Sequence, residues 1–267
     1  MRMLHPDLLD RRALALIELI DPIGRSVLGQ ALMSGAGLRT VAKGGGRSAV
    51  VAAQGFAAHE AAFAAPPNNP AVGQVDYRID ILPADRGLAP RSVTLKLPRD
   101  PDPANRANEA SLFSPIRVAL LPSPQCPIPA TAAAVRITVR KKGDGRRVAG
   151  ALVRVVTSGN KFQAMALTDA IGEALVIVPE FPLTHTGPGG QIDSALGAKA
   201  TVVAAPNAIT LVADADISAA RAAAQSATSG FADPDAIDKA LPAPAGGVAL
   251  QLSTRTIAIL ELEWKNP

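Results

Sequence analysis

The sequence predicts a mainly β protein, built as two tandem β-sandwich domains with a short helix in the C-terminal part. Short runs of alternating apolar and polar residues recur along the chain, and 23 prolines and 22 glycines among 267 residues interrupt them. A turn pattern near residue 24 also returns near residue 145. Frequent turns are typical of many short strands and argue against a helical bundle. Only 3% of the residues are aromatic, so the cores must be built from Ala, Val, Leu and Ile.

The stretch from residue 135 to residue 179 shows the strand pattern most clearly. Val135, Ile137 and Val139 alternate with polar residues, which predicts a strand with one dry face and one wet face. Three further strands are expected over residues 151–155, 162–167 and 174–178. The turns between them contain Gly, Asn or Asp, which tolerate positive φ or hydrogen-bond their own backbone.

Two motifs in this stretch resemble a known family. GRRVAGALV at residues 145–153 and TDAIGEA at residues 168–174 resemble a strand and a turn of the carboxypeptidase regulatory-like, transthyretin-like β-sandwich. The resemblance implies Ig-like or transthyretin-like sandwich architecture. It implies little about function, because this module serves as spacer, adhesion unit and scaffold.

The N-terminal part repeats the start of this stretch. A strand over residues 14–20 is followed by a turn and by GRSVLG at 24–29, which matches GRRVAG at 145–150 in four of six positions. GRSAVV at 46–51 falls where GEALVI falls at 172–177. We interpret the pattern as an internal duplication.

Further elements follow from the same reasoning. Strands are expected over residues 75–81, 93–97 and 116–121, and four prolines between 122 and 129 predict a spacer between domains 1–125 and 126–267. The C-terminal part should contain a loop over 184–190, a strand over 199–204, an Ala-rich helix over 217–227, a helical turn opened by Asp233-Pro234-Asp235 and closing strands within 248–264.

Composition excludes several classes of protein. The net charge of +4 is small and scattered, which argues against nucleic-acid binding. No run approaches the roughly 18 apolar residues of a membrane helix, and the N-terminus lacks a signal-peptide pattern. The expected location is cytoplasmic, including within an assembled or released particle; export without a cleaved signal stays open. Cys126 is the only cysteine, which excludes an intrachain disulfide and a zinc cluster.

The most suggestive polar run is DPDPANRANE at residues 100–109. Asp100, Asp102, Asn105 and Glu109 offer oxygens of the kind that bind calcium. The spacing departs from a helix–loop–helix calcium loop, because Asn105 stands where glycine is needed. We therefore predict a surface loop with a helical turn over 104–112, which serves as an interaction loop without metal.

No other stretch carries a catalytic pattern. His5, His59 and His185 are far apart in sequence, and no nucleophile elbow accompanies them. The glycines at 44–46 lack the Gly-Lys-Ser/Thr ending of a phosphate loop and predict a hairpin tip. Cys126 has no evident activating partner. We expect a protein that is not an enzyme and needs no cofactor.

The expected function is that of a structural or adaptor component of a bacterial multi-protein assembly. Its partners would be proteins, with a second copy of the chain among the candidates. The layout resembles accessory proteins of contractile, phage-tail-like injection particles, through LPRDPDPAN at 97–105 and the strand-to-loop arrangement over 111–129. The alternative is a monomeric binding or adhesion module with ligand loops at one sandwich end. An enzyme with an unrecognised site is the third hypothesis.

Overall fold

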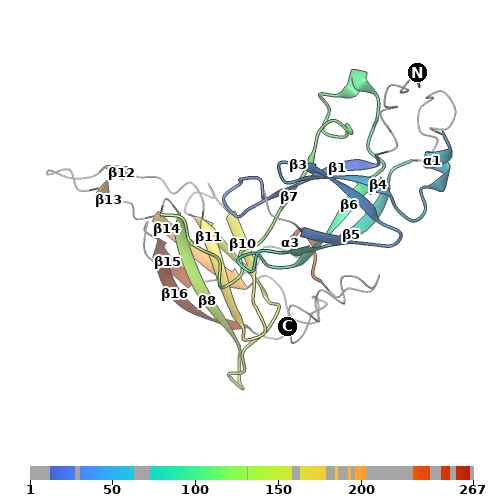
Figure 1. The fold of residues 1–267 in the computed structure, drawn as a ribbon. Helices are drawn as coiled ribbons and strands as arrows, with labels where there is room; N and C mark the ends of the chain where they lie inside the picture. The colour runs from blue at the N-terminus through green and yellow to red at the C-terminus, as the bar shows by residue number, and fades with distance from the viewer. Residues whose placement is uncertain are drawn as a thin grey trace.

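The computed structural model describes residues 13–27, 31–62, 73–130, 132–157, 163–178, 184–185, 192–193, 196–202, 231–240, 248–252 and 257–264. These residues are mainly β, as predicted. The strands up to residue 119 form one pair of sheets and those from residue 133 form another, and the two groups lie beside each other (Figure 1).

The N-terminal sandwich packs a four-stranded sheet, ordered β3-β4-β1-β7, against a three-stranded sheet, ordered β2-β5-β6. Strands β1, β5, β6 and β7 lie where the alternating pattern predicts them, whereas β2 and helix α1 were not expected. The elements are β1 (Ala15–Ile20), β2 (Ala31–Ser34), β3 (Arg39–Gly44), β4 (Arg47–Ala52), α1 (Ala57–Ala62), β5 (Val75–Pro83), β6 (Arg91–Leu97), the 3-10 turn η1 (Pro103–Asn105) and β7 (Ile116–Ala119).

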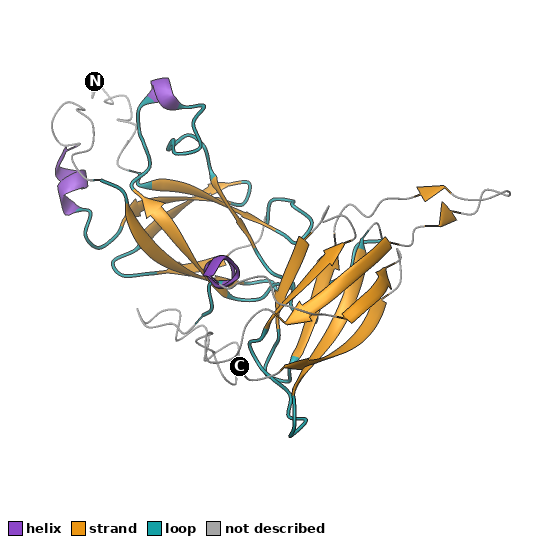
Figure 2. Cartoon of the chain, turned by 180° about the vertical axis from the view of Figure 1, so that it is seen from behind, coloured by secondary structure: helices purple, strands orange, loops and turns teal. Residues whose placement is uncertain are grey.

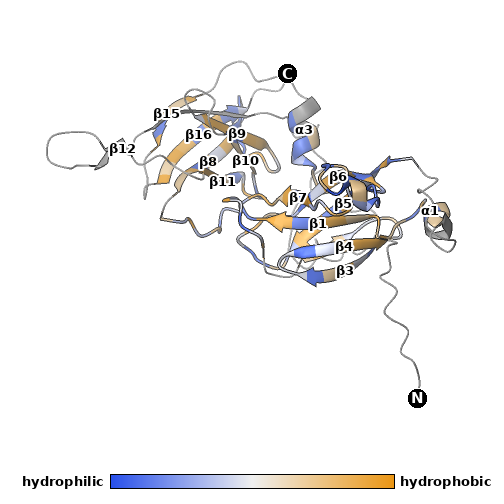
Figure 3. Ribbon diagram, turned by 90° about the horizontal axis from the view of Figure 1, so that it is seen from above, coloured by the Kyte–Doolittle hydropathy of each residue, from blue (hydrophilic) through white to orange (hydrophobic). Residues whose placement is uncertain are grey.

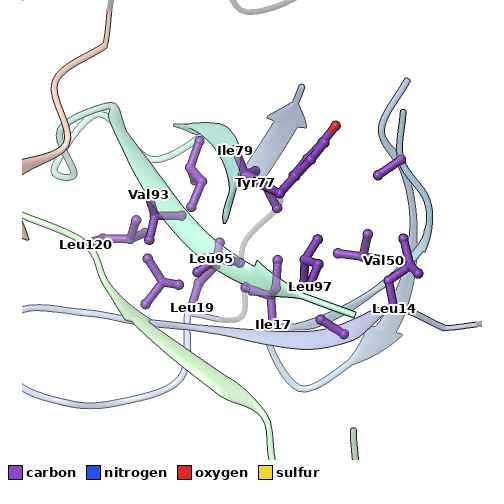
Figure 4. Packing of buried hydrophobic residues seen from close by; sticks show 14 of the residues in the cluster. Leu14, Ile17, Leu19, Val50, Tyr77, Ile79, Val93, Leu95, Leu97 and Leu120 are labelled. Atoms are coloured by element: carbon purple, nitrogen blue, oxygen red, sulfur yellow. The ribbon is translucent and has the colours of Figure 1, made fainter. Parts of the chain in front are cut away.

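Aliphatic side chains from both sheets fill the N-terminal core. Ile17 and Leu19 of β1 face Ile79 of β5 and Leu95 of β6 across the sandwich (Figure 4). The aromatic contribution is small: Tyr77 packs edge-on against Phe56 with ring centroids 6.1 Å apart. The Tyr77 hydroxyl donates to the Ala36 carbonyl, so its polar end is satisfied.

The C-terminal sandwich packs β11-β8-β16 against β10-β9-β14-β15. Val135, Ile137 and Val139 of β8 are fully buried, which confirms the predicted dry face. Trp264, 8% exposed, belongs to the same core. The elements are β8 (Ala133–Lys141), β9 (Leu152–Thr157), β10 (Gln163–Leu167), β11 (Glu173–Val178), β12 (Thr184–His185), β13 (Ile192–Asp193), β14 (Leu196–Val202), α3 (Pro234–Ala240), β15 (Val248–Leu252) and β16 (Ile257–Trp264).

The two sandwiches repeat one scheme of strand pairing. β1 pairs antiparallel with β4 and parallel with β7, and β8 pairs antiparallel with β11 and parallel with β16. In the second sheet, β5 lies antiparallel to β2 and β6, and β14 lies antiparallel to β9 and β15. One strand differs, because β3 pairs with β4 whereas its counterpart β10 pairs with β9.

Backbone hydrogen bonds confirm the predicted equivalence of the turns. Val27 donates to the Leu19 carbonyl at 2.8 Å, and Val148 donates to the Val139 carbonyl at 2.9 Å. Leu19 and Val139 in turn donate to the carbonyls of Gly46 and Gly172. These two glycines have φ of +74° and +73°, a conformation that costs little only for glycine.

Some sequence predictions are wrong in detail. The expected loop over 184–190 begins with β12, which pairs with β13. In place of the helical turn expected over 104–112 the structure has the shorter turn η1, which Asp102 caps and Pro103 begins. The Asp233-Pro234-Asp235 helix start is confirmed by α3. The helix expected over 217–227 lies outside the described residues.

Candidate interaction surfaces

The loop over residues 99–115 contains the predicted interaction run 100–109 and brings together three of the four side chains named in that run. Asp100 accepts hydrogen bonds from the Asp102 amide at 2.9 Å and from the Asn105 side chain at 2.7 Å. Asp102 accepts from the Ala104 amide at 2.8 Å. These oxygens therefore stabilise the loop itself and are not directed at a ligand.

Glu109 stands apart from this cluster. Its side chain is exposed, and Ser111 beside it is fully buried. Burial lowers the pKa of the Arg99 guanidinium, and the charge of Glu109 opposes that shift. Among the described residues no group of three or more His, Cys, Asp or Glu is arranged to hold a metal ion. The exposed polar side chains of the loop are Arg106, Asn108 and Glu109, and Phe113 beside them is 51% exposed.

A second surface was not foreseen from the sequence. Residues 231–240 belong to the C-terminal part of the chain, yet residues 231–235 lie on the edge strand β6 of the N-terminal sandwich. Phe231 is 2% exposed and packs on Leu82 and Leu32. The Ser92 amide donates to the Ala232 carbonyl at 2.7 Å, and the Arg78 guanidinium donates to the Phe231 carbonyl. The segment therefore covers a sheet edge that would otherwise be open.

A buried arginine holds this segment in place. Arg91 of β6 is fully buried and donates to the Ala119 carbonyl at 2.6 Å and to the Asp235 carboxylate at 2.5 Å. Asp233 lies 3.7 Å from the same guanidinium. A buried guanidinium is costly without an anion, so removal of these carboxylates would leave an uncompensated charge.

Helix α3 continues from this contact to the C-terminal sandwich. Asp238 forms an ion pair with Arg154 of β9 and accepts a hydrogen bond from Gln163 of β10 at 3.2 Å. The carboxylates of one seven-residue helix and its cap thus bind arginines of both sandwiches. Figure 2 shows α3 between the two groups of strands, and Figure 3 shows the same from above.

The proline-rich linker forms a second contact between the sandwiches. Ile23, Cys126 and Ile128 pack on an apolar patch of β8 and β11, made by Ala132, Ala134, Leu175 and Ile177. The Ser123 amide donates to the Gly87 carbonyl at 2.9 Å, and Arg136 donates to the Pro124 carbonyl at 3.2 Å. The linker is packed on both sides, whereas a spacer would stand free. We call this contact and the α3 contact together the joint.

Cys126 lies in the joint as a half-buried thiol. Burial raises the pKa of the Cys126 thiol, and the carboxylates of Asp85 and Asp21 raise it further. The thiolate is therefore disfavoured, which agrees with an inert residue. His59 is buried in α1, His185 lies in β12, which forms a separate two-stranded sheet with β13, and His5 lies outside the described residues.

The outer faces of the equivalent sheets carry opposite charge arrangements. Glu18 on the central strand β1 lies between Arg47 of β4, at 3.5 Å, and Arg117 of β7, at 3.3 Å. On the C-terminal sheet the central strand β8 supplies the cations instead. Arg136 pairs with Glu173 of β11 at 3.7 Å, and Arg140 pairs with Glu261 of β16 at 2.8 Å.

The pKa of Glu18 is lowered by this environment. The largest cause is the hydrogen bond that the Ser26 hydroxyl donates at 2.7 Å; burial opposes it, and the two arginines add to the lowering. Ser26 occupies the turn position equivalent to Arg147 of the second sandwich, which pairs with Glu173 at 3.1 Å. The same turn thus supplies a partner to an acid in both halves.

Comparisons with known proteins give little. No family model matches the chain, and no curated protein matches its sequence. Among solved structures, similarity is found to the Bacillus anthracis TIE protein, with 10% identity over 94% of this chain and a TM-score of 0.23. The chain spans about a third of that protein.

Two pilins give matches of the same quality. The match to the minor pilin GBS52 of Streptococcus agalactiae covers 95% of this chain and 96% of the pilin chain, with 8% identity and a TM-score of 0.27. The major pilin subunit BcpA of Bacillus cereus gives 7% identity over 95% of this chain and 60% of its own, with a TM-score of 0.26.

Superpositions at these TM-scores are too poor to carry an argument about function. They add nothing in support of the resemblance to carboxypeptidase regulatory-like domains or to injection-particle proteins. No helix within the described ranges combines the length and the apolar character needed to cross a membrane.

Proposed function

We propose that the chain is a non-enzymatic structural or adaptor component of a bacterial multi-protein assembly. The observation that carries the proposal is the joint. A buried arginine, an apolar anchor and a packed linker hold two sandwiches in one orientation. Independent binding modules do not need a fixed angle, whereas a building unit transmits its geometry to its neighbours through that angle.

The proposal extends to the kind of assembly. A contractile, phage-tail-like injection particle is the candidate that the layout around residues 97–129 resembles. The carboxypeptidase regulatory-like module would supply the sandwich scaffold for it. Both rest on resemblance in sequence alone.

The alternative proposal is a monomeric binding or adhesion module. The 99–115 loop favours it, because the loop projects from the N-terminal sandwich and presents Phe113 and Glu109 outward (Figure 1). An exposed aromatic residue on a rigid loop is a common contact residue for proteins and sugars.

The boundary between residues 125 and 126 is also a proposal. A protease site introduced between residues 129 and 132 would cut the chain there. We expect the two pieces to stay associated after cutting through α3 and through the packing of Ile23, Cys126 and Ile128, and replacement of both Phe231 and Asp235 by Ala should weaken that association. Two pieces that precipitate or unfold on cutting would contradict the boundary.

Sedimentation from native cells tests the assembly proposal. A tagged chain should co-sediment with a particle much larger than its own 27.3 kDa. Replacement of Asp100 and Asp102 is a poor probe of contact, since both stabilise the loop. Phe113→Ser changes an exposed side chain and leaves the charge of Glu109 near Arg99 in place, and Ile171→Ser, 54% exposed on the other sandwich, is the matched control. If the chain is found solely as a monomer that binds a small ligand tightly, the assembly proposal is wrong and the binding-module proposal takes its place.

A further inference from the structure

Two exposed sheet edges lie at opposite flanks of the two equivalent sheets. β3 ends the sheet β3-β4-β1-β7 and every one of its residues is exposed. β16 ends the sheet β11-β8-β16 and exposes Ile257, Ile259, Glu261 and Glu263, which alternate with core residues. In the part of the chain that the structure describes, no strand pairs with the outer side of either one. An edge strand presents backbone N–H and C=O groups that another strand can pair with.

Two other edges, both in the N-terminal sandwich, are protected. β7, the counterpart of β16, is four residues long, and its Ala119 carbonyl accepts a hydrogen bond from Arg91. β6 is covered by residues 231–235. β16, by contrast, is eight residues long and carries Ile259, which is 82% exposed. A long edge with exposed isoleucines is a liability in a protein that stays monomeric.

The side chains of the two edges are complementary. β3 presents Arg39, Val41 and Lys43, and Val41 is 44% exposed. β16 presents isoleucines followed by glutamates. A β3–β3 contact would oppose cations, and a β16–β16 contact could join isoleucines but would leave the carboxylates without a cation from the partner. Only β3 against β16 joins apolar to apolar and base to acid.

We propose, on the basis of the assembly function above, that copies of this chain associate head to tail, with β3 of one copy paired to β16 of the next. The partner is thus a second copy of the same chain. The contact is heterologous, so each copy keeps one β3 edge and one β16 edge for further neighbours, and association continues beyond a dimer.

The strand order fixes the direction of pairing. β3 runs in the direction of β1, because both lie antiparallel to β4. β16 runs in the direction of β8 and lies on the flank that β7 occupies in the first sheet. Because β3 lies on the other flank, only a parallel pairing keeps the outer faces of both sheets on one side. With Val41 beside Ile259, this pairing places Lys43 beside Glu261.

The resulting charge pattern already exists inside the molecule. Glu18 lies between cations from both neighbouring strands, Arg47 and Arg117. Glu261 has one such neighbour, Arg140 at 2.8 Å. Lys43 of the next copy would supply the second cation, and the interface would reproduce the arrangement found around Glu18.

Two variants and their mixture test the proposal with the full chain. Sedimentation velocity over a concentration series should show the parent protein growing beyond a dimer. Val41→Lys blocks β3 and Ile259→Lys blocks β16, because each places a lysine in the interface. Each variant alone should be monomeric. Their equimolar mixture should form a dimer and nothing larger, since one intact β3 meets one intact β16.

A charge exchange tests the register. Lys43→Glu and Glu261→Lys should each shift the midpoint of association by about tenfold or more in concentration, and the double variant should recover the parent behaviour. Phe113→Lys, an exposed apolar residue on the 99–115 loop, is the matched control and should associate like the parent. Circular dichroism checks that each variant is folded.

The contrary outcomes are distinct. A parent protein that stays monomeric at high concentration, or stops at a dimer, overturns the head-to-tail contact. So does a Val41→Lys variant that still associates. None of these results alters co-sedimentation with a particle in native cells, which tests the assembly function separately.

Discussion

The two sandwiches have the same strand pairing and opposite surface charges. In both, a central strand lies antiparallel to one neighbour and parallel to the other. In both, an amide of that strand donates a hydrogen bond to the carbonyl of a glycine with positive φ. The N-terminal sheet places an acid between arginines, whereas the C-terminal sheet places arginines between glutamates. The fold is therefore specified by inward residues and turns, and the outer faces are free to specialise.

The sandwiches also differ in how they complete their edges. The N-terminal sandwich takes its cover for β6 from residues 231–235, a segment inserted between β14 and β15 of the C-terminal sandwich. Among the described residues, the N-terminal sandwich and the linker contact the C-terminal sandwich through Ile23, Cys126 and Ile128, which pack on its outer face. The N-terminal sandwich thus depends on the C-terminal part more than the reverse.

Phe231→Ala should break this dependence and have the largest effect. Loss of a buried phenylalanine costs about 3 kcal/mol or more of unfolding free energy. We expect the loss in the N-terminal transition of a urea titration, with the C-terminal transition unchanged. Equal destabilisation of both sandwiches would show that they unfold as one unit.

Asp235→Asn should have the next largest effect. It leaves the buried Arg91 without its nearest anion, at a cost of about 2 kcal/mol, because Asp233 at 3.7 Å compensates in part. Asp76→Asn removes an exposed pair with Lys96 and should change stability by less than about 0.5 kcal/mol. Similar losses for both variants would mean that Arg91 does not require Asp235.

Gly46→Ala and Gly172→Ala compare the two equivalent turns. Both glycines have positive φ, and an added Cβ would lie 2.5 Å from the Val27 carbonyl oxygen or 2.8 Å from the Arg147 Cβ. Gly44→Ala and Gly143→Ala share the positive φ but meet nothing within 4 Å, so they should lose about 1 kcal/mol. The first two should lose about 1 kcal/mol more, measured by thermal unfolding. Equal losses at all four positions would leave only the backbone conformation as the cause.

Glu18→Gln should give the smallest effect and a dependence on pH. The pKa of Glu18 is lowered in the folded protein, so its contribution is present above its ordinary pKa of 4.5 and is lost as pH falls through the folded value. At pH 7 the variant should lose about 1 kcal/mol, since the arginine partners are largely exposed. The difference in unfolding free energy between the variant and the parent should disappear at acidic pH.

Glu261→Gln is the control in the other sandwich, because its side chain is exposed and only one cation lies beside it. Its effect on the isolated monomer should be within a few tenths of a kcal/mol. A gap between Glu18→Gln and the parent that persists well below the folded pKa of Glu18 would assign the loss to packing.

The sequence predicts the strands well because burial alternates within them. Val135, Ile137 and Val139 are buried on one face, as their spacing indicates. The match of residues 24–27 to 145–148 also predicts real equivalent turns, since a positive-φ glycine and the following amide have local geometric requirements. β2 was missed, because its four residues are half-buried and show no clear alternation.

The candidate site was predicted less well. Asp100, Asp102 and Asn105 are neighbours as expected, but they bond one another, and only Glu109 faces outward. Nothing local to Arg91 indicates that it is buried against carboxylates more than 140 residues later. Such contacts depend on where the chain returns, which periodicity and spacing do not encode. Asp233-Pro234-Asp235 predicted the start of helix α3, but it did not indicate that Arg91 would be the partner of these carboxylates.

The return of residues 231–235 to β6 has a consequence during synthesis. All strands of the N-terminal sandwich leave the ribosome before residue 120, whereas Phe231 follows more than a hundred residues later. At about 5–20 residues per second the interval is roughly 10 s. Throughout it the nascent sandwich carries an uncovered β6 edge, a vacant position beside Leu82 and a guanidinium without its carboxylates. The first half of this polypeptide can therefore misassemble until residue 231 has been synthesised, and ribosomes that pause before residue 231 would prolong that period.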